Sequence, residues 1–355
     1  MKQPTTMKHK LLKIVAITIS IIVISIGGFV TYIKTALPNV GDAPELKITA
    51  TPEQVERGRY LANNVMLCME CHSDRDWSVF GAPIIDGTYG KGGTIFNQNH
   101  GFPGTYLSTN ITPTGLGHWS DGEIFRAITT GVSKDGHPLF PIMPYNNYGK
   151  LDSTDIISVI AYIRTLAPVE HRPATSKSDF PVNIVIHTLP EKASFTTIPS
   201  RDDKVKYGEY LVTAANCFAC HTKMEDSKFT GQPFAGGHEF QMGEVTIRSA
   251  NLTPHVTGIG DWSEEMFIQR FKMYTDSSYK PTTPDVIGYQ TVMPWLYFSR
   301  MTNEDLASIY AYLRSLPPAD HTVVKVTNTK EETEAKEKAE AKEKSKSKDV
   351  GDAEI

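Results

Sequence analysis

The chain has 355 residues, 40% of them hydrophobic, and a formal net charge of −4 at pH 7. This length allows two or three small domains, and the composition is ordinary for globular domains. A small negative net charge argues against nucleic acid as a partner.

The chain begins with a segment that is typical of a membrane anchor. An uncharged run at 14–33 follows four lysines in residues 1–13, a region that contains no acidic residue. Twenty helical residues rise about 30 Å, which is the thickness of the hydrocarbon core of a bilayer. The lysines predict that residues 1–13 lie in the cytoplasm and that everything after Lys34 lies outside it. A cleaved signal peptide is the alternative, and it would export the chain equally.

After a linker at 34–50, the sequence signals the start of a helix. Thr51-Pro52-Glu53-Gln54 matches a capping box with proline at the first helical position. We expect this helix to run towards Cys68.

Two Cys-x-x-Cys-His motifs use all four cysteines of the chain. The first is Cys68-Met69-Glu70-Cys71-His72, and the second is Cys217-Phe218-Ala219-Cys220-His221. This pattern is typical of covalent haem c attachment, with the cysteines forming thioethers and the histidine binding the iron. A zinc ribbon needs the two pairs much closer together, and a thioredoxin-like pair needs a βαβ context. The motifs therefore predict two haem c groups, held by Cys68, Cys71, Cys217 and Cys220 and ligated by His72 and His221.

An internal repeat organises the region between the anchor and the C-terminus. Its matched segments follow in the same order in both copies: 58–61 with 208–211, 108–113 with 249–254, 117–120 with 260–263, 141–145 with 291–295, and 161–166 with 311–316. The repeat predicts two homologous domains at 51–172 and 200–321, joined by an extended linker at 173–199. Each should close with a helix, starting at Asp152 and at Thr302.

The sixth iron ligand should lie at equivalent positions of the repeat. Met143 and Met293 satisfy this, and each is followed by proline and an aromatic residue. Methionine ligation raises the reduction potential of a haem, and the proline stiffens the loop. A second histidine is the alternative, and His171 and His321 are the histidines matched across the repeat. The other methionines on helices, Met66, Met69, Met266 and Met273, fit core positions.

Other repeated residues leave their role open. Trp119 and Trp262 suit either a contact with the haem edge or an ordinary core position. Asn110 and Asn251 suit a turn better than a haem contact. Glycines at 58 and 208 would let the opening helix of each domain approach the closing helix.

The C-terminal segment at 322–355 reads as a charged disordered tail. From Lys330 to Lys348 it contains only Lys, Glu, Ala, Ser and Thr, so it offers no large apolar side chain to a core. A docking role for the tail is the alternative.

Together these motifs resemble the membrane-bound cytochrome c subunits of bacterial alcohol, aldehyde and gluconate-type dehydrogenases, over about residues 51–320. The resemblance rests on both Cys-x-x-Cys-His motifs, the Asn-Ile-Thr-Pro and Asn-Leu-Thr-Pro elements at 110–113 and 251–254, and the two Met-Pro-aromatic loops. It implies a mainly α fold of two tandem class I cytochrome c-like domains. It also implies axial ligation by His72 with Met143 and by His221 with Met293.

These expectations describe a dihaem electron carrier with no catalytic residues of its own. It would lie in the inner membrane of a bacterium as a single-pass protein, with its haem domains on the periplasmic or external face. There it would pass electrons from a dehydrogenase or a soluble carrier to the respiratory chain or a terminal oxidase. The rival interpretation is a dihaem peroxidase, which needs one open iron and an acid–base group beside it. A haem-based sensor or assembly factor has no feature in its favour.

Overall fold

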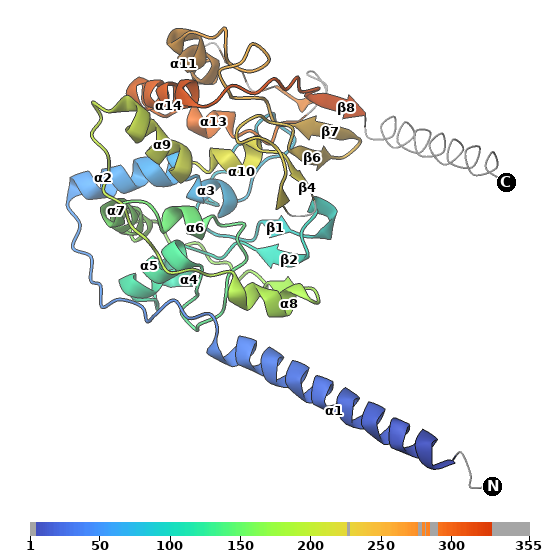
Figure 1. Cartoon of the computed structure of the whole chain (residues 1–355). Helices are drawn as coiled ribbons and strands as arrows, with labels where there is room; N and C mark the ends of the chain where they lie inside the picture. Colours follow the sequence, from blue (N-terminus) through green and yellow to red (C-terminus); the bar gives the residue numbers. More distant parts are fainter. Residues whose placement is uncertain (1–4, 226–227, 276–278, 281, 285–289, 329–355) are drawn as a thin grey trace, which may run out of the picture.

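A long N-terminal helix stands apart from the rest of the molecule. The computed structural model describes residues 5–225, 228–275, 279–280, 282–284 and 290–328. Helix α1, Thr5–Ala36, projects from the globular body (Figure 1). Its part His9–Ala36 is long and apolar enough to cross a membrane. This length and composition suit both an anchor and a signal sequence.

The globular body begins with the predicted capping box. Thr51 and Gln54 cap each other, and helix α2, Pro52–Tyr60, continues as the π-helical turn η1, Leu61–Val65. Helix α2 packs against α7, Ser153–Ile163, whose N-cap is Asp152. The approach is close at Gly58, where an added Cβ would lie 1.7 Å from the carbonyl oxygen of Ser158.

The second half repeats this helix pair. Helix α9, Lys204–Ala214, packs against α14, Asn303–Ser315, which begins after the N-cap Thr302. A Cβ at Gly208 would lie 1.9 Å from the carbonyl oxygen of Ser308. Both predicted helix starts and both predicted glycine contacts are therefore confirmed.

Short elements fill the space between the opening and closing helices. In the first half these are α3 (Cys68–Cys71), β1 (Ile95–Phe96), η2 (Gln98–His100), β2 (Gly104–Leu107), α4 (Pro113–Leu116), α5 (Asp121–Thr130) and α6 (Tyr145–Tyr148). In the second half they are α10 (Cys217–His221), β4 (Met224–Glu225), β5 (Lys228–Phe229), β6 (Glu239–Met242), β7 (Val245–Arg248), α11 (Glu264–Lys272) and α13 (Trp295–Phe298). The fold thus combines the expected helices with small sheets, which were not predicted from the sequence.

Each half also carries a three-stranded antiparallel sheet whose last strand comes from beyond its closing helix. In the first half the order is β1-β2-β3, with β3 (Lys177–Ser178) pairing Ser178 with Gly104. In the second half the order is β6-β7-β8, with β8 (Val326–Asn328) pairing Asn328 with Val245.

Two segments differ from the sequence prediction. The stretch 173–199, predicted to be extended, contains β3, the short helix α8 (Val182–Val185) and the 3₁₀ turn η3 (Ile186–Thr188). The predicted tail at 322–355 begins with β8, because backbone pairing with β7 orders residues that have little core of their own. Residues 329–355, which hold the charged run, lie outside the described residues.

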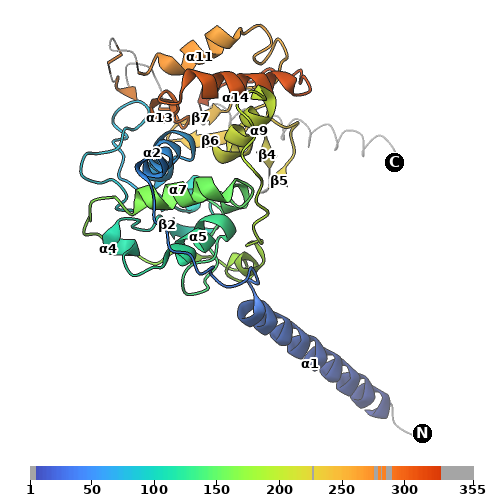
Figure 2. The same ribbon diagram turned by 90° about the vertical axis from the view of Figure 1, so that its left-hand side faces the viewer.

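The two halves are interlocked by reciprocal hydrogen bonds. Tyr60 of α2 donates its hydroxyl to Asp305 of α14, at 2.6 Å. Tyr210 of α9 donates its hydroxyl to Asp155 of α7, at 2.7 Å. Figure 2 shows α2, α7, α9 and α14 grouped in the middle of the body. Buried side chains of both halves belong to one continuous core, so the interface is part of the folded interior.

Candidate functional site

Both Cys-x-x-Cys-His motifs begin directly after a residue with left-handed backbone. Leu67 has φ 57° and Asn216 has φ 54°. Such a conformation is costly for leucine and persists only where the surrounding structure imposes it. It reverses the chain between the opening helix and the short helices α3 and α10, which carry the cysteines.

The histidine of each motif is oriented by a backbone carbonyl. Nδ1 of His72 lies 2.7 Å from the carbonyl oxygen of Thr109, and Nδ1 of His221 lies 2.8 Å from that of Ala250. A carbonyl oxygen only accepts, so Nδ1 carries the proton in both rings and Nε2 keeps its lone pair. Burial lowers the pKa of both imidazoles, and these hydrogen bonds offset it only in part. A neutral imidazole with a free Nε2 is able to bind a metal ion.

The residues after these carbonyls fix the carbonyls in place. The amide of Asn110 donates to the carbonyl oxygens of Val169 and His171, both at 2.9 Å, while its own oxygen accepts from Thr112. Asn251 makes the matching set of bonds with Ala319, His321 and Thr253. The asparagines therefore close a turn, as expected. Through these bonds, the backbone that carries the carbonyl acceptor of each histidine is connected to the chain beyond the closing helix.

The two Met-Pro-aromatic loops share one turn. The backbone N–H of Tyr145 donates to the carbonyl of Met143 at 2.7 Å, and that of Trp295 donates to the carbonyl of Met293 at 2.8 Å. Pro144 and Pro294 have φ near −80° and ψ near 60°, which is the geometry of an inverse γ-turn. This turn holds the backbone of each methionine in a defined position at the start of α6 or α13.

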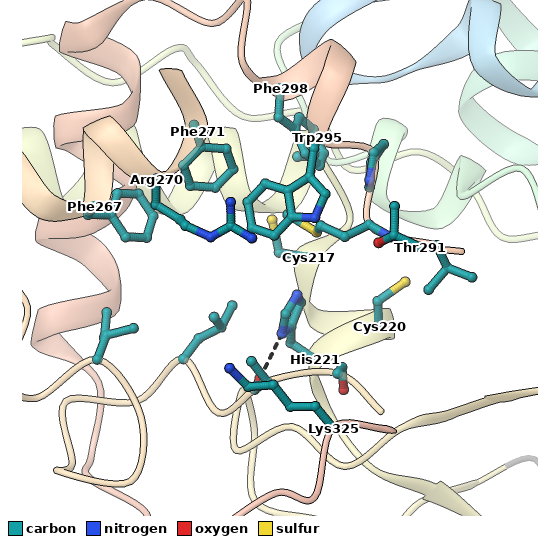
Figure 3. Close-up of a pocket in the computed structure, with 18 of the residues that line it drawn as sticks. Cys217, Cys220, His221, Phe267, Arg270, Phe271, Thr291, Trp295, Phe298 and Lys325 are labelled. Carbon is teal, nitrogen blue, oxygen red and sulfur yellow. Dashed lines mark hydrogen bonds between the residues drawn. The ribbon is translucent and has the colours of Figure 1, made fainter. Parts of the chain in front are cut away.

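A cavity of about 720 Å³ brings the second set of predicted residues together, and we call it the second cavity because it surrounds the second motif. Cys217, Cys220, His221 and Met293 all line it. Figure 3 shows both cysteines and His221 around its open centre, with Trp295 on the side opposite His221. The volume lies within the range of about 300–1,000 Å³ that is usual for ligand and cofactor pockets. Burial raises the pKa of Cys217 to about 12 and that of Cys220 to about 11, so both thiols stay protonated at neutral pH.

An aromatic and cationic wall of this cavity was missed by sequence reasoning. The guanidinium of Arg270 lies 4.0 Å from the ring centroid of Trp295 and donates to the hydroxyl of Tyr274 at 2.8 Å. Trp262, whose place in the sequence suited either a haem contact or a core position, also lines the cavity. Arg270 has no charged counterpart at the aligned position of the first half, so the repeat gave no signal for it.

The first half contributes to the same cavity. Leu67 directly before the first motif, Glu70 within it and Phe80 in the loop after it all line the cavity. Glu70 is buried and lies 2.5 Å from Arg75, which also donates to the carbonyl oxygens of Gly81 and Ala82. The ion pair therefore braces the loop that reaches across to the second half.

The loop after the first motif is bonded directly to the second methionine loop. The side chain of Gln290 accepts from the backbone N–H of Gly81 at 2.9 Å and donates to the carbonyl oxygen of Val79. Tyr297 donates its hydroxyl to the carbonyl oxygen of Ala82 at 3.2 Å. The wall of the second cavity is thus held from both halves of the chain.

The remaining predicted residues occupy varied places. Met143, Cys68 and Trp119 are half-buried against the shared core. His321 bonds Nδ1 to the carbonyl oxygen of Ala235 and does not belong to the lining of the described cavity. Among the methionines predicted as core, Met66 and Met69 are buried, whereas Met266 and Met273 are about half exposed on α11, so that prediction was wrong for them.

Comparison with known proteins identifies the class of the second half. Residues 205–317 match the model of the cytochrome c family, so this part of the chain resembles a cytochrome c domain. Such a domain implies haem c and electron transfer.

About three quarters of the chain is similar to cytochrome c subunits of dehydrogenases. It is 29% identical over 286 residues to the cytochrome c subunit of an alcohol dehydrogenase (quinone) of Gluconacetobacter polyoxogenes, covering 74% of this chain and 56% of the relative. It is 28% identical over 291 residues to the cytochrome c subunit of gluconate 2-dehydrogenase of Pantoea cypripedii, covering 75% and 60%. The chain thus spans little more than half the length of these two relatives.

A shorter relative is matched over most of its length. The diheme cytochrome c-type protein of Cereibacter sphaeroides is 26% identical over 261 residues, covering 70% of this chain and 82% of the relative. The two longer relatives confirm the resemblance to dehydrogenase cytochrome subunits that was inferred from the motifs.

Proposed function

We propose that the chain is a membrane-anchored dihaem c-type cytochrome that carries electrons between a dehydrogenase and the respiratory chain. Two tandem cytochrome c domains, at 51–172 and 200–321, would each hold one haem. The observation that carries the proposal is the repeated hydrogen bond that leaves Nε2 of His72 and of His221 free for iron.

The side chains of the second cavity fit a covalently bound haem. Its lining combines two thiols, Cys217 and Cys220, with a neutral imidazole and the thioether of Met293. Thiols for attachment and a His–Met pair for the iron are the donor set of a c-type electron carrier. We assign Cys68, Cys71, His72 and Met143 the same roles in the first half.

The chemistry that the haem groups supply when bound is the one-electron exchange of their iron. The protein's own contribution is to hold and shield the site. The carbonyl oxygens of Thr109 and Ala250 keep the proton on Nδ1, so each histidine presents one fixed tautomer. The γ-turns at Pro144 and Pro294 restrain the methionine backbones. Phe271, Trp295 and Phe298 give the second cavity an aromatic wall.

The direction of the anchor follows from the charges at its start. Lysines 2, 8, 10 and 13 precede the apolar run without any acidic residue, and this bias keeps an N-terminus in the cytoplasm. The globular body would then lie on the periplasmic face, where it meets its redox partners. A dehydrogenase subunit is the partner favoured by the two relatives named as dehydrogenase subunits.

The first experiment is a spectrum of the purified, reduced protein before and after addition of carbon monoxide, with haem quantified. Two haems per chain and an unchanged spectrum are expected, since both irons would be closed by protein ligands. Binding of carbon monoxide at one haem would contradict the carrier and indicate an open iron, as a peroxidase needs.

A further inference from the structure

A small apolar surface lies beside the end of the helix proposed to span the membrane. It consists of Phe180, which lies just before α8, and Val185, the last residue of α8. We call this surface the α8 patch. Phe180 is 79% exposed, more than any other large apolar side chain among the described residues, and Val185 is 47% exposed. Figure 1 shows α8 on the side of the body from which α1 projects.

Helix α8 and the turn η3 are packed against the last turns of α1. Among the described side chains of α1, Ile33 alone is buried, and Ile186 of η3 is also buried. Nδ1 of His187 lies 3.2 Å from the carbonyl oxygen of Leu37, directly after α1. Helices in contact have axes about 8–10 Å apart. The α8 patch is therefore a close lateral neighbour of the C-terminal end of α1.

That end of α1 has the residues of a membrane boundary. Tyr32 is 59% exposed, and Lys34 is the first charged residue after the apolar run. Aromatic and basic side chains gather at the level of the lipid headgroups. A segment that contacts α1 at residues 33–37 consequently lies at the same depth.

The exposure of Phe180 is built into the fold. The backbone N–H of Asp179 donates to the carbonyl of Pro103, and its carboxylate accepts from Gln98 at 2.7 Å. Strand β3 pairs with β2 immediately before this point. The ring is thus presented from a segment that is fixed on both sides, and no described side chain covers most of it.

We propose that the α8 patch inserts into the headgroup layer of the membrane that α1 spans, as a second contact between body and lipid. This inference rests on the proposed membrane anchor. A single helix lets the body tilt and swivel, whereas a second apolar contact beside it fixes which face of the body lies on the bilayer. Interfacial segments of this kind bury their apolar face about 5–10 Å into the boundary layer.

The test uses full-length, haem-loaded protein in nanodiscs that carry one copy each. Single cysteines are introduced as F180C, V185C, V256C and I24C, and the rate of labelling by a charged, membrane-impermeant thiol reagent is measured. Val256 is 67% exposed in the second half and serves as the matched control in water, while Ile24 is 73% exposed on α1. Wild-type protein, with its cysteines bound to haem, sets the background.

We expect F180C to be labelled at least about tenfold more slowly than V256C, a rate ratio that corresponds to about 1.4 kcal/mol. V185C should be slowed as well, because it belongs to the same patch. A neutral, lipid-soluble maleimide should label F180C readily, which would prove that its thiol is reactive.

The two possible failures are distinguishable. If I24C is labelled as fast as V256C, the membrane anchor itself is wrong. If I24C is protected while F180C and V185C react as fast as V256C, the anchor stands and the membrane contact of the α8 patch is overturned. In that case the patch would be free for another protein.

Discussion

The two halves of the body share their backbone geometry but differ in the charges around their motifs. A left-handed residue, a histidine bonded to a carbonyl, an Asn-x-Thr-Pro turn and a Met-Pro γ-turn occur in both. The first motif adds the buried pair Glu70–Arg75, where the second has Ala219 and Met224. The second cavity instead has Arg270 stacked on Trp295.

This difference separates the features that orient the proposed iron ligands from those that would adjust the reduction potential of the iron. The geometry that orients the histidine and the methionine is repeated in each half, as the proposed ligation of two irons requires. Charges near an iron shift its reduction potential without changing how it is held. We therefore expect two sites of the same ligation with different potentials.

Removing the attachment cysteines of one half should have the largest effect. The double substitution C217A/C220A is expected to remove covalent haem from the second site only, so that half of the haem remains after denaturation and extraction. The matched variant C68A/C71A should leave the other half. Loss of all haem from either variant would show that the two sites do not load independently.

Replacing either methionine should open one iron. M293A and M143A are each expected to lower one of the two reduction potentials by more than about 59 mV, a tenfold change in the equilibrium of a one-electron couple. The changed haem should then bind carbon monoxide. M273A, at a half-exposed position directly after α11, is the control and should leave both potentials unchanged. If M293A also leaves both potentials unchanged, Met293 is not a ligand.

The glycine contacts test whether the two helix pairs are equivalent. G58A and G208A each place a methyl group against a backbone carbonyl, and overpacking of this kind costs about 1–3 kcal/mol or more. Both should lower the melting temperature by similar amounts in thermal unfolding followed by circular dichroism. G27A has no atom within 4 Å of its new Cβ and should be neutral.

The ion pairs of the two buried aspartates should behave unequally. Arg57 makes two bonds to Asp155, at 2.9 and 2.7 Å, whereas Arg201 makes one to Asp305 and is 57% exposed. Burial alone would lower the pKa of Arg57, but its bonds to Asp155 raise it. R57A should cost about 3 kcal/mol, at the low end for a broken buried pair.

R201A, the matched variant, should cost less than about 1 kcal/mol, as expected of an exposed partner. Unfolding by urea measures both values. Equal losses would mean that solvent exposure does not separate the two pairs, and that Tyr60 and Tyr210 dominate the environment of the aspartates.

The sequence was sufficient for features that depend on local spacing. The capping box at Thr51 and the helix starts at Asp152 and Thr302 follow from nearby residues, and the structure has each of them. The close approach at Gly58 and Gly208 was predicted from their matched places in the repeat. The second set of site residues also lies together in one cavity.

Features that depend on contacts with distant parts of the chain could not be predicted from the sequence. A leucine gives no sign of the left-handed backbone that Leu67 adopts, since the surrounding fold imposes it. The carbonyl acceptors at Thr109 and Ala250 are backbone atoms, so no residue type marks them. Met266 of α11 and Met273 directly after it have the spacing of a core stripe, yet about half of each side chain is exposed.

The interlocked halves bear on the order in which the chain can be completed. Asp155 is buried in the first half, but its partner Tyr210 comes from the second, and Phe80 of the first half walls the second cavity. Chains fold from the N-terminus as they emerge. The first half would therefore fold while the carboxylate of Asp155 still lacks its bond from Tyr210. The second half would then fold against Phe80, which is already part of the first half.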